Sequence, residues 1–238
     1  TIYFKGLNGI RAIAVIIVVI WHTDQFADQL GLLSKKFYLS GMAIRAVDMF
    51  FVLSGFLITY LLLKEKEKTN TIDINKFYIR RILRIWPLYY IMIFVSLLLI
   101  NLDIVPDVDS LFTSVIFYTF LMANISYLLH IDIKSITQLW SVGVEEQFYL
   151  IWPNLIKRTS NYFTIFIGIF IGGCALRIII FYSLRNVYPY LIDFLYMFRI
   201  NIMALGALGA LLYFKGHSWL KFVYRKELQI VSWGVLIY

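Results

Sequence analysis

The chain has 238 residues, of which 61% are hydrophobic and only 15% are charged, and its formal net charge is +8. Soluble domains are about half apolar and about a quarter charged, so this composition, with a mean hydropathy of +0.78, excludes an ordinary soluble domain. The sequence instead predicts an all-α, polytopic transmembrane helical bundle, because several runs approach the roughly 20 apolar residues that a helix needs to cross a bilayer. The positive charges gather between these runs, which is typical of membrane topology and does not indicate nucleic-acid binding.

The chain has one cysteine, Cys174, in an apolar run, which excludes a disulfide framework and a thiolate metal site. We find no zinc-ligand spacing, phosphate-binding loop or nucleophile elbow, and we expect neither a bound metal nor a bound cofactor. The first apolar run lacks a small-residue cleavage site and is expected to be retained as a helix. The final run, residues 228–238, is too short to span a bilayer, so we expect residues 1–238 to form a single membrane domain truncated at its C-terminal end.

The first predicted span covers residues 7–26 and carries two ionisable residues, Arg11 and His22. Such residues are costly within a lipid-length segment and usually face a protein interior or a water-filled cavity. Their spacing corresponds to about three helical turns, so both side chains lie on one face, roughly 16 Å apart along the axis. The alternative is that Arg11 reaches the lipid headgroups and His22 caps the helix at the opposite surface.

The second predicted span covers residues 42–63, with Arg45 and Asp48 in its first turns. Asp48 can pair with Arg45 or with one of the two ionisable residues of the first span. It can also simply suit a helix N-terminus, where an acidic residue is favoured. Ser54 and Gly55, farther along the span, are interpreted as a site of close helix packing.

The densest basic cluster follows the second span. Its seven members are Lys64, Lys66, Lys68, Lys76, Arg80, Arg81 and Arg84. The positive-inside rule places this cluster in the cytoplasm, so we expect a multi-pass protein of the inner or plasma membrane with a cytoplasmic N-terminus. Arg11 then lies toward the inner side of the membrane and His22 in the outer half. The acidic connection at residues 101–109 is expected outside.

The rest of the chain contains four long apolar runs and one short, interrupted run. The predicted spans cover residues 82–100, 111–129, 163–182 and 190–214. The run at residues 138–153 is interrupted by Glu145 and Glu146, so we expect it to be re-entrant or buried among other helices. If residues 82–100 and 111–129 cross the membrane and residues 138–153 do not, an even number of crossings separates the basic cluster from Lys157. Both basic segments then lie on the cytoplasmic side. The alternative is that residues 111–129 fail to cross, which would place Glu145 outside.

Arg81 and Arg84 are neighbours at positions i and i+3 of a helix at the predicted cytoplasmic surface. Paired arginines grip phosphate or diphosphate groups through bidentate hydrogen bonds, which makes the pair a candidate phosphate site. The alternative is an ordinary positively charged flank that contacts anionic lipid.

Glu145 and Glu146 lie beside an apolar run, where at least one carboxylate is expected to be paired or protonated. Ser141 and Glu145 are i, i+4 neighbours if the segment is helical. The alternative is a surface amphipathic helix with solvated glutamates. Arg199 lies deep enough in its predicted span to need a partner, and the glycines that follow it suit close helix packing.

Four segments together resemble the membrane-bound acyltransferase 3 family, which includes O-acetyltransferases of bacterial lipopolysaccharide, peptidoglycan, Nod factors and macrolides. They are Arg11 with His22, VDMFFVLSGFLI at 47–58, FYIRRILRIWPLYY at 77–90 and LWSVGVEEQFYLIWP at 139–153. The resemblance covers roughly residues 4–215, the first part of the family's membrane domain. Two positions depart from the family pattern: Ala46 stands where glycine is usual, and Asn201 follows Arg199 where an aspartate is usual.

The resemblance implies transfer of an acyl group, usually acetyl, from a cytoplasmic acyl-CoA to a hydroxyl of a carbohydrate or lipid-linked glycan acceptor. His22 would then be the general base or a transient acyl carrier, since neutral imidazole is the common choice for either role near pH 7. Arg11, Arg81 and Arg84 would hold the phosphate-rich donor or developing negative charge. Glu145 would orient the acceptor or help proton transfer. The supporting residues would be Asp48, Ser141, Glu146 and Arg199.

Two other classes of function fit part of the sequence. Arginine, histidine, aspartate and glutamate inside membrane spans are also expected in a proton-coupled transporter or exporter of a small molecule or glycolipid. Against a transporter, the sequence has no repeated halves and no pair of Gly- or Pro-broken segments in matching positions. A membrane sensor or scaffold would leave the buried ionisable residues unexplained. Acyl-CoA-dependent acylation by the purified protein would separate the enzyme from both.

Overall fold

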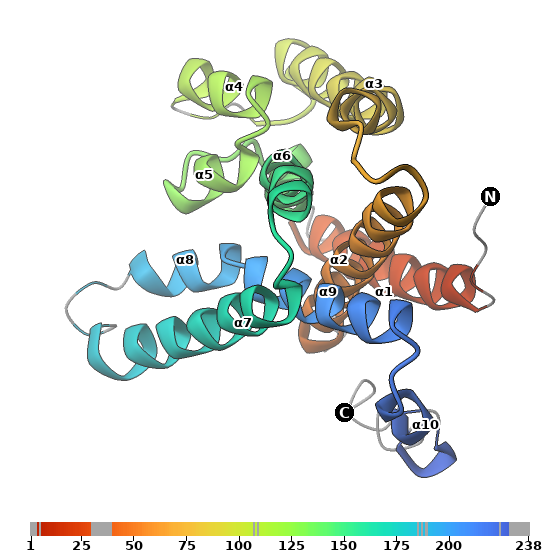
Figure 1. The fold of residues 1–238 in the computed structure, drawn as a ribbon. Helices are drawn as coiled ribbons and strands as arrows, with labels where there is room; N and C mark the ends of the chain where they lie inside the picture. Colours follow the sequence, from red (N-terminus) through yellow and green to blue (C-terminus); the bar gives the residue numbers. More distant parts are fainter. Residues whose placement is uncertain are drawn as a thin grey trace.

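The computed structural model describes most of the chain, and helices dominate it (Figure 1). The described residues are 4, 6–29, 40–106, 108, 110–184, 186, 188, 190–223 and 225–228. The final apolar run beyond residue 228, residues 30–39 of the first connection, and Asp107 and Asp109 of the acidic connection lie outside them. All regular structure in the described part is helical, and five helices are long and apolar enough to cross a bilayer, which confirms an all-α membrane bundle. These five cover Leu7–Gln25, Gly41–Thr69, Ile74–Asn101, Tyr162–Leu184 and Leu191–Phe214.

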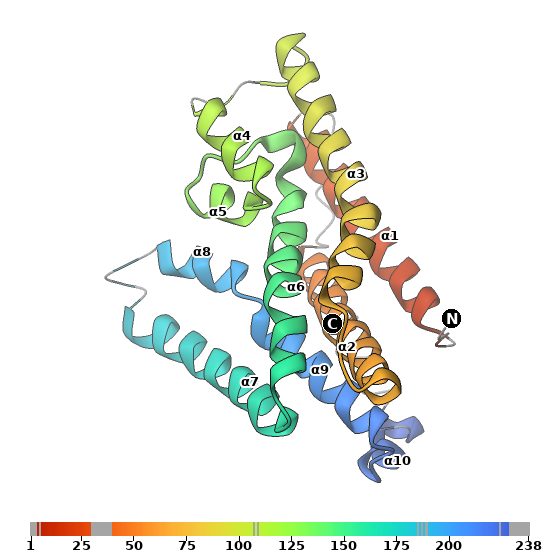
Figure 2. The same cartoon turned by 45° about the horizontal axis from the view of Figure 1, so that its top comes forward.

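The helices are labelled in chain order in Figure 1. Their bounds are α1 Leu7–Gln29, α2 Ser40–Thr69, α3 Ile74–Asn101, α4 Leu111–Thr119, α5 Ala123–Leu128, the 3₁₀-helix η1 Lys134–Leu139, α6 Trp140–Arg158, α7 Tyr162–Ile179, the π-helical turn η2 Ile180–Leu184, α8 Tyr190–Met197, α9 Ile200–Phe214 and α10 Trp219–Val223. In Figure 1, α6 lies between α3, α4 and α5 on one side and α2, α7 and α9 on the other, and in Figure 2 it lies between α3 and the pair α4 and α5. It is therefore the central helix of the bundle.

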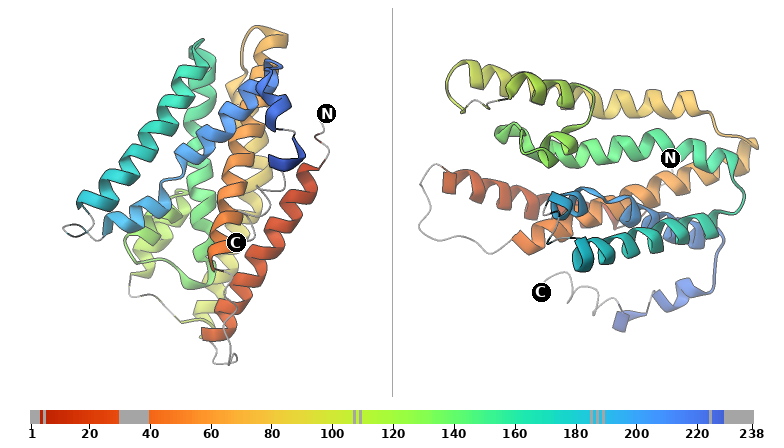
Figure 3. Two further views of the ribbon diagram at one scale, coloured as in Figure 1. Left: turned by 90° about the horizontal axis from the view of Figure 1, so that it is seen from below. Right: turned by 90° about the vertical axis from the view of Figure 1, so that its left-hand side faces the viewer.

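The closest helix packing joins α2 to α9, and α1 also lies along α2 (Figure 3). A Cβ atom on Gly55 would lie 2.0 Å from the Met203 carbonyl oxygen, and one on Gly206 would lie 2.0 Å from that of Val52. Both positions require glycine, because no real Cβ atom approaches a carbonyl oxygen so closely. The predicted close packing at these glycines is confirmed.

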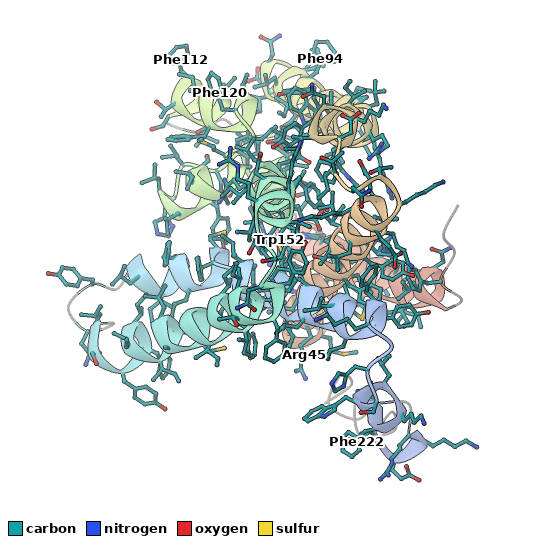
Figure 4. The ribbon with its side chains drawn as sticks, viewed as in Figure 1. Arg45, Phe94, Phe112, Phe120, Trp152 and Phe222 are labelled. Carbon is teal, nitrogen blue, oxygen red and sulfur yellow. The ribbon has the colours of Figure 1, made fainter. Side chains whose placement is uncertain are left out.

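An aromatic core lies where α6 meets α2 and α7. The Trp152 ring stacks on Phe148 and Phe166, with centroid distances of 4.3 and 5.0 Å, and its indole N–H donates to Thr59 Oγ1 at 2.7 Å. Trp152 is central in Figure 4, whereas Phe112 projects outward and is 81% exposed. Such outward apolar side chains are compatible with a bilayer, because lipid tails are equally apolar.

The apolar run at residues 111–129 does not form one span, so that prediction is wrong. It forms α4 and α5, of 9 and 6 residues, and the chain turns between them at Leu121, whose φ is 60°. The turn packs on α6 at Gly143, where a Cβ would lie 2.9 Å from the Leu121 carbonyl oxygen. The side-chain amides of Asn124 and Gln147 also exchange hydrogen bonds of 3.2 and 2.9 Å between α5 and α6. This tertiary packing overrides the apolar length of the run.

The segment at residues 138–153 is not re-entrant, because most of it belongs to the continuous helix α6, but it is buried among other helices, which is the other predicted possibility. α6 has 19 residues, which corresponds to about 28 Å at ~1.5 Å per residue. Its end lies beside the end of α2: Lys66 Nζ donates to the carbonyl oxygens of Ile156 and Lys157 at 2.9 and 3.0 Å, and Lys157 Nζ donates to that of Ile72 at 3.0 Å. The two basic segments therefore share one end of the bundle, as the parity argument requires. Glu145 lies inside the bundle.

The predicted span at residues 190–214 is broken into α8 and α9 at Phe198 and Arg199. Arg177 Nη2 donates to the carbonyl oxygens of Leu195 and Phe198 at 2.9 and 2.8 Å, and Arg199 Nη1 donates to that of Leu195 at 3.2 Å. These guanidinium groups satisfy carbonyl oxygens that the interrupted helix leaves without backbone partners, which makes the break tolerable in a membrane. Arg199 is thereby placed at a helix junction.

Candidate functional site

A cavity of about 530 Å³ lies between α1, α2, α3 and α6. It is lined by Arg11 of α1, by Arg81 and Arg84 of α3 and by Glu145 of α6, and we call it the arginine cavity. Its remaining wall consists mostly of apolar side chains of α1 and α2. The fold thus brings together four of the predicted site residues from three helices that are far apart in the sequence.

Glu145 is held by two hydroxyl groups. Ser54 Oγ donates to its Oε1 at 2.8 Å, and Tyr149 OH donates to its Oε2 at 2.9 Å. Tyr149 lies one turn farther along α6, a spacing from which this contact could be predicted. Ser54 lies on the facing stretch of α2, and its interpretation as a packing residue misses this hydrogen bond. Ser141 is not the partner, because its Oγ donates to the Gln138 carbonyl oxygen at 3.1 Å.

The arginine cavity carries an excess of positive charge. The Arg81 guanidinium lies over the rings of Phe77 and Tyr149, 5.4 Å from each centroid. Within the part of the chain that the structure describes, neither Arg81 nor Arg11 nor Arg84 forms an ion pair. Three guanidinium groups therefore face a single carboxylate. Such a site favours an anion with several acceptor oxygens, such as a phosphate or diphosphate group.

A second cavity, of about 330 Å³, lies toward the opposite end of α1. It is lined by His22, by Ser141 of α6 and by Arg199 at the α8–α9 junction, and we call it the histidine cavity. The His22 ring is partly buried and meets the Trp21 ring edge-on, with a centroid distance of 4.7 Å. His22 and Glu145 therefore line different cavities.

Asp48 forms an ion pair that the sequence did not predict. Its Oδ1 lies 2.7 Å from Nε of Arg199, a residue that is only 4% exposed. It pairs neither with Arg45, whose Nε donates to the Gly41 carbonyl oxygen at 3.0 Å, nor with the ionisable residues of α1. The deep arginine thus has the partner it needs, and α2 is tied to the α8–α9 junction. Arg177, which contacts the same junction, was not singled out by the sequence patterns, and it lines neither cavity.

The two cavities approach each other within a single helical turn. Their neighbouring lining residues are Val15 and Val18 on α1, Phe50 and Val47 on α2, and Glu145 and Ser141 on α6, with the first of each pair in the arginine cavity. One turn corresponds to about 5.4 Å along a helix. A group bound at the inner end of one cavity therefore lies close to the other.

Glu146 lies outside both cavities. Its Oε2 accepts a hydrogen bond of 3.1 Å from Trp86 Nε1, which ties α6 to α3. Its place is therefore beside the arginine cavity, and Glu145 alone of the two adjacent acids faces that cavity. Among the described residues, no group of three or more His, Cys, Asp or Glu side chains is arranged to hold a metal ion.

Comparison with known proteins finds relatives that are named as O-acetyltransferases. A Staphylococcus aureus (strain COL) protein provisionally named an O-acetyltransferase is 33% identical over 193 residues, which make up 75% of this chain and 30% of that protein. Peptidoglycan O-acetyltransferase OatA of Listeria monocytogenes is 35% identical over 159 residues, which are 63% of this chain and 24% of that protein. O-acetyltransferase OatA of Staphylococcus aureus (strain NCTC 8325) is 35% identical over 161 residues, 65% of this chain and 25% of that protein.

The chain thus spans about a quarter to a third of the length of the curated relatives it matches. No solved structure matches it at a significant level. A family model described as an acyltransferase domain matches residues 4–238, and the segments that carry the three cavity arginines, His22 and Glu145 all fall within that match. The chain therefore belongs to the acyltransferase 3 family.

Proposed function

We propose that this chain is the membrane domain of an O-acyltransferase. In this proposal it moves an acyl group, in the simplest case acetyl, from acyl-CoA to a hydroxyl of a carbohydrate or lipid-linked glycan. The main support is the arginine cavity, in which Arg11, Arg81 and Arg84 line a space of about 530 Å³ beside Glu145. That volume suits a ligand of substrate size. Family membership and the names of the relatives point the same way.

The donor is proposed to enter from the end of the bundle that carries the basic cluster. The arginine cavity is lined by Leu7 at the start of α1 and by Leu61 near the end of α2. Arg84 is exposed, whereas Arg81 is partly buried beside Glu145 and Tyr149. The phosphates of CoA would therefore lie at the outer arginine and the thioester at the inner one. The positive-inside rule makes this end cytoplasmic, with the N-terminus on the same side.

His22 supplies the imidazole in the proposed reaction. As a general base, it takes the proton of the acceptor hydroxyl while the hydroxyl oxygen attacks the thioester carbonyl and the CoA thiolate leaves. As a carrier, it first displaces the thiolate and then passes the acyl group to the hydroxyl. The short separation of the two cavities supports both routes. The proton taken up from the hydroxyl then passes to the CoA thiolate, and Glu145, at the inner end of the arginine cavity, would orient the acceptor hydroxyl or help this proton transfer.

The test is acyl transfer by the purified full-length protein in lipid vesicles. Acetyl-CoA is the donor, and peptidoglycan fragments are the first acceptor because the Listeria monocytogenes relative is named for that substrate. We expect release of CoA and formation of an acetyl ester that mass spectrometry detects on the glycan. An empty-vesicle control corrects for spontaneous hydrolysis. The donor assignment fails if neither CoA release nor binding of acetyl-CoA is observed.

One structural feature supports a transporter as the second candidate. The break between α8 and α9 places Arg199 at the junction of two half-helices beside the histidine cavity, and discontinuous helices form the substrate sites of many secondary transporters. A transporter would move a labelled glycolipid across vesicle membranes in response to a pH gradient without consuming acyl-CoA. Family membership favours the enzyme over this candidate.

A further inference from the structure

A third cavity, of about 340 Å³, lies beside the turn between α4 and α5, where α3 and α6 face outward. It is lined by Ile82, Phe120, Met122 and Leu150, and we call it the lateral cavity. All four side chains are exposed at the bundle surface, Phe120 to 68% and Leu150 to 64%, and Phe120 projects outward in Figure 4. The lateral cavity is thus largely apolar, open toward the lipid and as large as a small-molecule site.

Few polar side chains border the lateral cavity, and most of their hydrogen-bonding groups have partners. Glu146 Oε2 accepts the hydrogen bond from Trp86, while its Oε1 is buried and has no hydrogen-bond partner among the described residues. Gln147 exchanges two hydrogen bonds with Asn124. An occupant of the lateral cavity therefore meets mostly hydrocarbon surface, and a strongly hydrated ligand is disfavoured there.

The lateral cavity shares a wall with the arginine cavity, because Arg81 and Tyr149 line both. Tyr149 is fixed by its hydrogen bond to Glu145, whereas Arg81 Nε has no hydrogen-bond partner. The Arg81 guanidinium is held by its two ring contacts. The wall therefore contains one anchored side chain and one that can turn aside without breaking a hydrogen bond at Nε.

We propose that the lateral cavity holds the hydrocarbon chain of the acyl group, so that the protein transfers acyl groups longer than acetyl. This inference rests on the acyltransferase function proposed above. The CoA phosphates lie at Arg11 and Arg84, the thioester carbonyl lies at Arg81, and the chain continues past Tyr149. In the transfer the C–S bond breaks, a C–O bond forms and the hydroxyl proton passes to the thiolate. The lateral cavity sets the chain-length preference and takes no part in these steps.

Binding of acyl-CoA tests this inference before any acceptor is identified. The full-length protein in nanodiscs is titrated with acetyl-, butyryl-, hexanoyl- and octanoyl-CoA. Each additional buried methylene should lower Kd by about fourfold. Ile82→Trp, which fills the lateral cavity, should remove this gain and leave the Kd of acetyl-CoA unchanged. Leu83→Trp is the matched control, because Leu83 is the next residue of α3, is 71% exposed and lines neither cavity.

Leu150→Trp fills the lateral cavity from α6 and replaces Ile82→Trp if that variant does not fold. Equal Kd values for acetyl- and octanoyl-CoA in the wild-type protein would overturn the inference and leave the proposed function intact. Failure to bind acetyl-CoA at all would overturn the proposed function as well. A chain-length gain that survives both tryptophan variants would come from partition into the nanodisc lipid, and the occupant of the lateral cavity would then be a phospholipid chain.

Discussion

At the residue scale, the two candidate catalytic side chains are held to different degrees. Glu145 accepts hydrogen bonds from Ser54 and Tyr149, so the orientation of its carboxylate is fixed. The His22 imidazole contacts the Trp21 ring, and no hydrogen bond to it occurs among the described residues. An imidazole without a competing partner can present a nitrogen lone pair to a substrate, which suits a base or nucleophile.

His22→Gln should abolish detectable acyl transfer in the full-length protein. Glutamine keeps one hydrogen-bonding group but can neither take up the hydroxyl proton nor carry the acyl group. Loss of a catalytic base typically lowers the rate by about two to four orders of magnitude. His217→Gln, at an exposed histidine after α9, is the matched control and should keep normal activity. Near-normal rates in His22→Gln would make His22 structural and move the catalytic assignment to Glu145.

Arg84→Ala should raise KM for acyl-CoA by about tenfold or more with a smaller effect on kcat, because it removes charged hydrogen bonds to the donor phosphates. Arg80→Ala is the matched control. Arg80 lies outside the arginine cavity, and among the described residues its ion pair is with Glu65 at 3.6 Å, a largely solvent-exposed pair that contributes little. Equal donor kinetics in the two variants would show that Arg84 belongs to a lipid-contacting flank.

At the element scale, the bundle depends on the contact between α2 and α9. This contact positions Ser54 on one helix and, through Asp48, the junction that carries Arg199. The arginine cavity, through Ser54, and the histidine cavity, through Arg199, are therefore both positioned by α2 and α9. A wider α2–α9 spacing would disturb the two cavities together, although neither glycine at the contact touches a substrate.

Gly206→Ala should destabilise the protein, because its Cβ would lie 2.0 Å from the Val52 carbonyl oxygen and the backbones would have to separate. Overpacking of this kind costs about 1–3 kcal/mol or more. Thermal unfolding in detergent, followed by fluorescence-detected size exclusion, measures the change. Gly168→Ala in α7 is the control, since nothing lies within 4 Å of its added Cβ. A normal unfolding midpoint for Gly206→Ala would mean that α2 and α9 are not packed this closely.

At the scale of the whole molecule, the two cavities divide the bundle into two functional ends. The arginine cavity lies toward the end where Lys66 and Lys157 bind backbone carbonyl groups, and the histidine cavity lies toward the other. Such an arrangement suits a donor and an acceptor that approach from opposite sides of a membrane. Which end faces the cytoplasm determines the side from which the donor enters.

We expect the end that carries Lys68 to face the cytoplasm, as the positive-inside rule requires. In a Cys174→Ala background, Lys68→Cys should react with a membrane-impermeant maleimide only after the cells are opened. His130→Cys, at the opposite end, should react in intact cells because the His130 side chain is 71% exposed. Labelling of Lys68→Cys from outside would reverse the orientation and with it the donor assignment.

The sequence alone determined the all-α membrane class, the placement of Arg11 and His22 on one helix, and the family, because apolar length, helical period and short motifs are local properties of the chain. Tertiary structure decided which apolar runs form helices long enough to cross a bilayer: residues 111–129 turn at Leu121, where the turn packs on α6 at Gly143. The tertiary structure also determined that Asp48 pairs with Arg199 and that Glu145 accepts a hydrogen bond from Ser54. A charged group pairs with whatever the neighbouring helix presents, and helix adjacency is not contained in any local pattern.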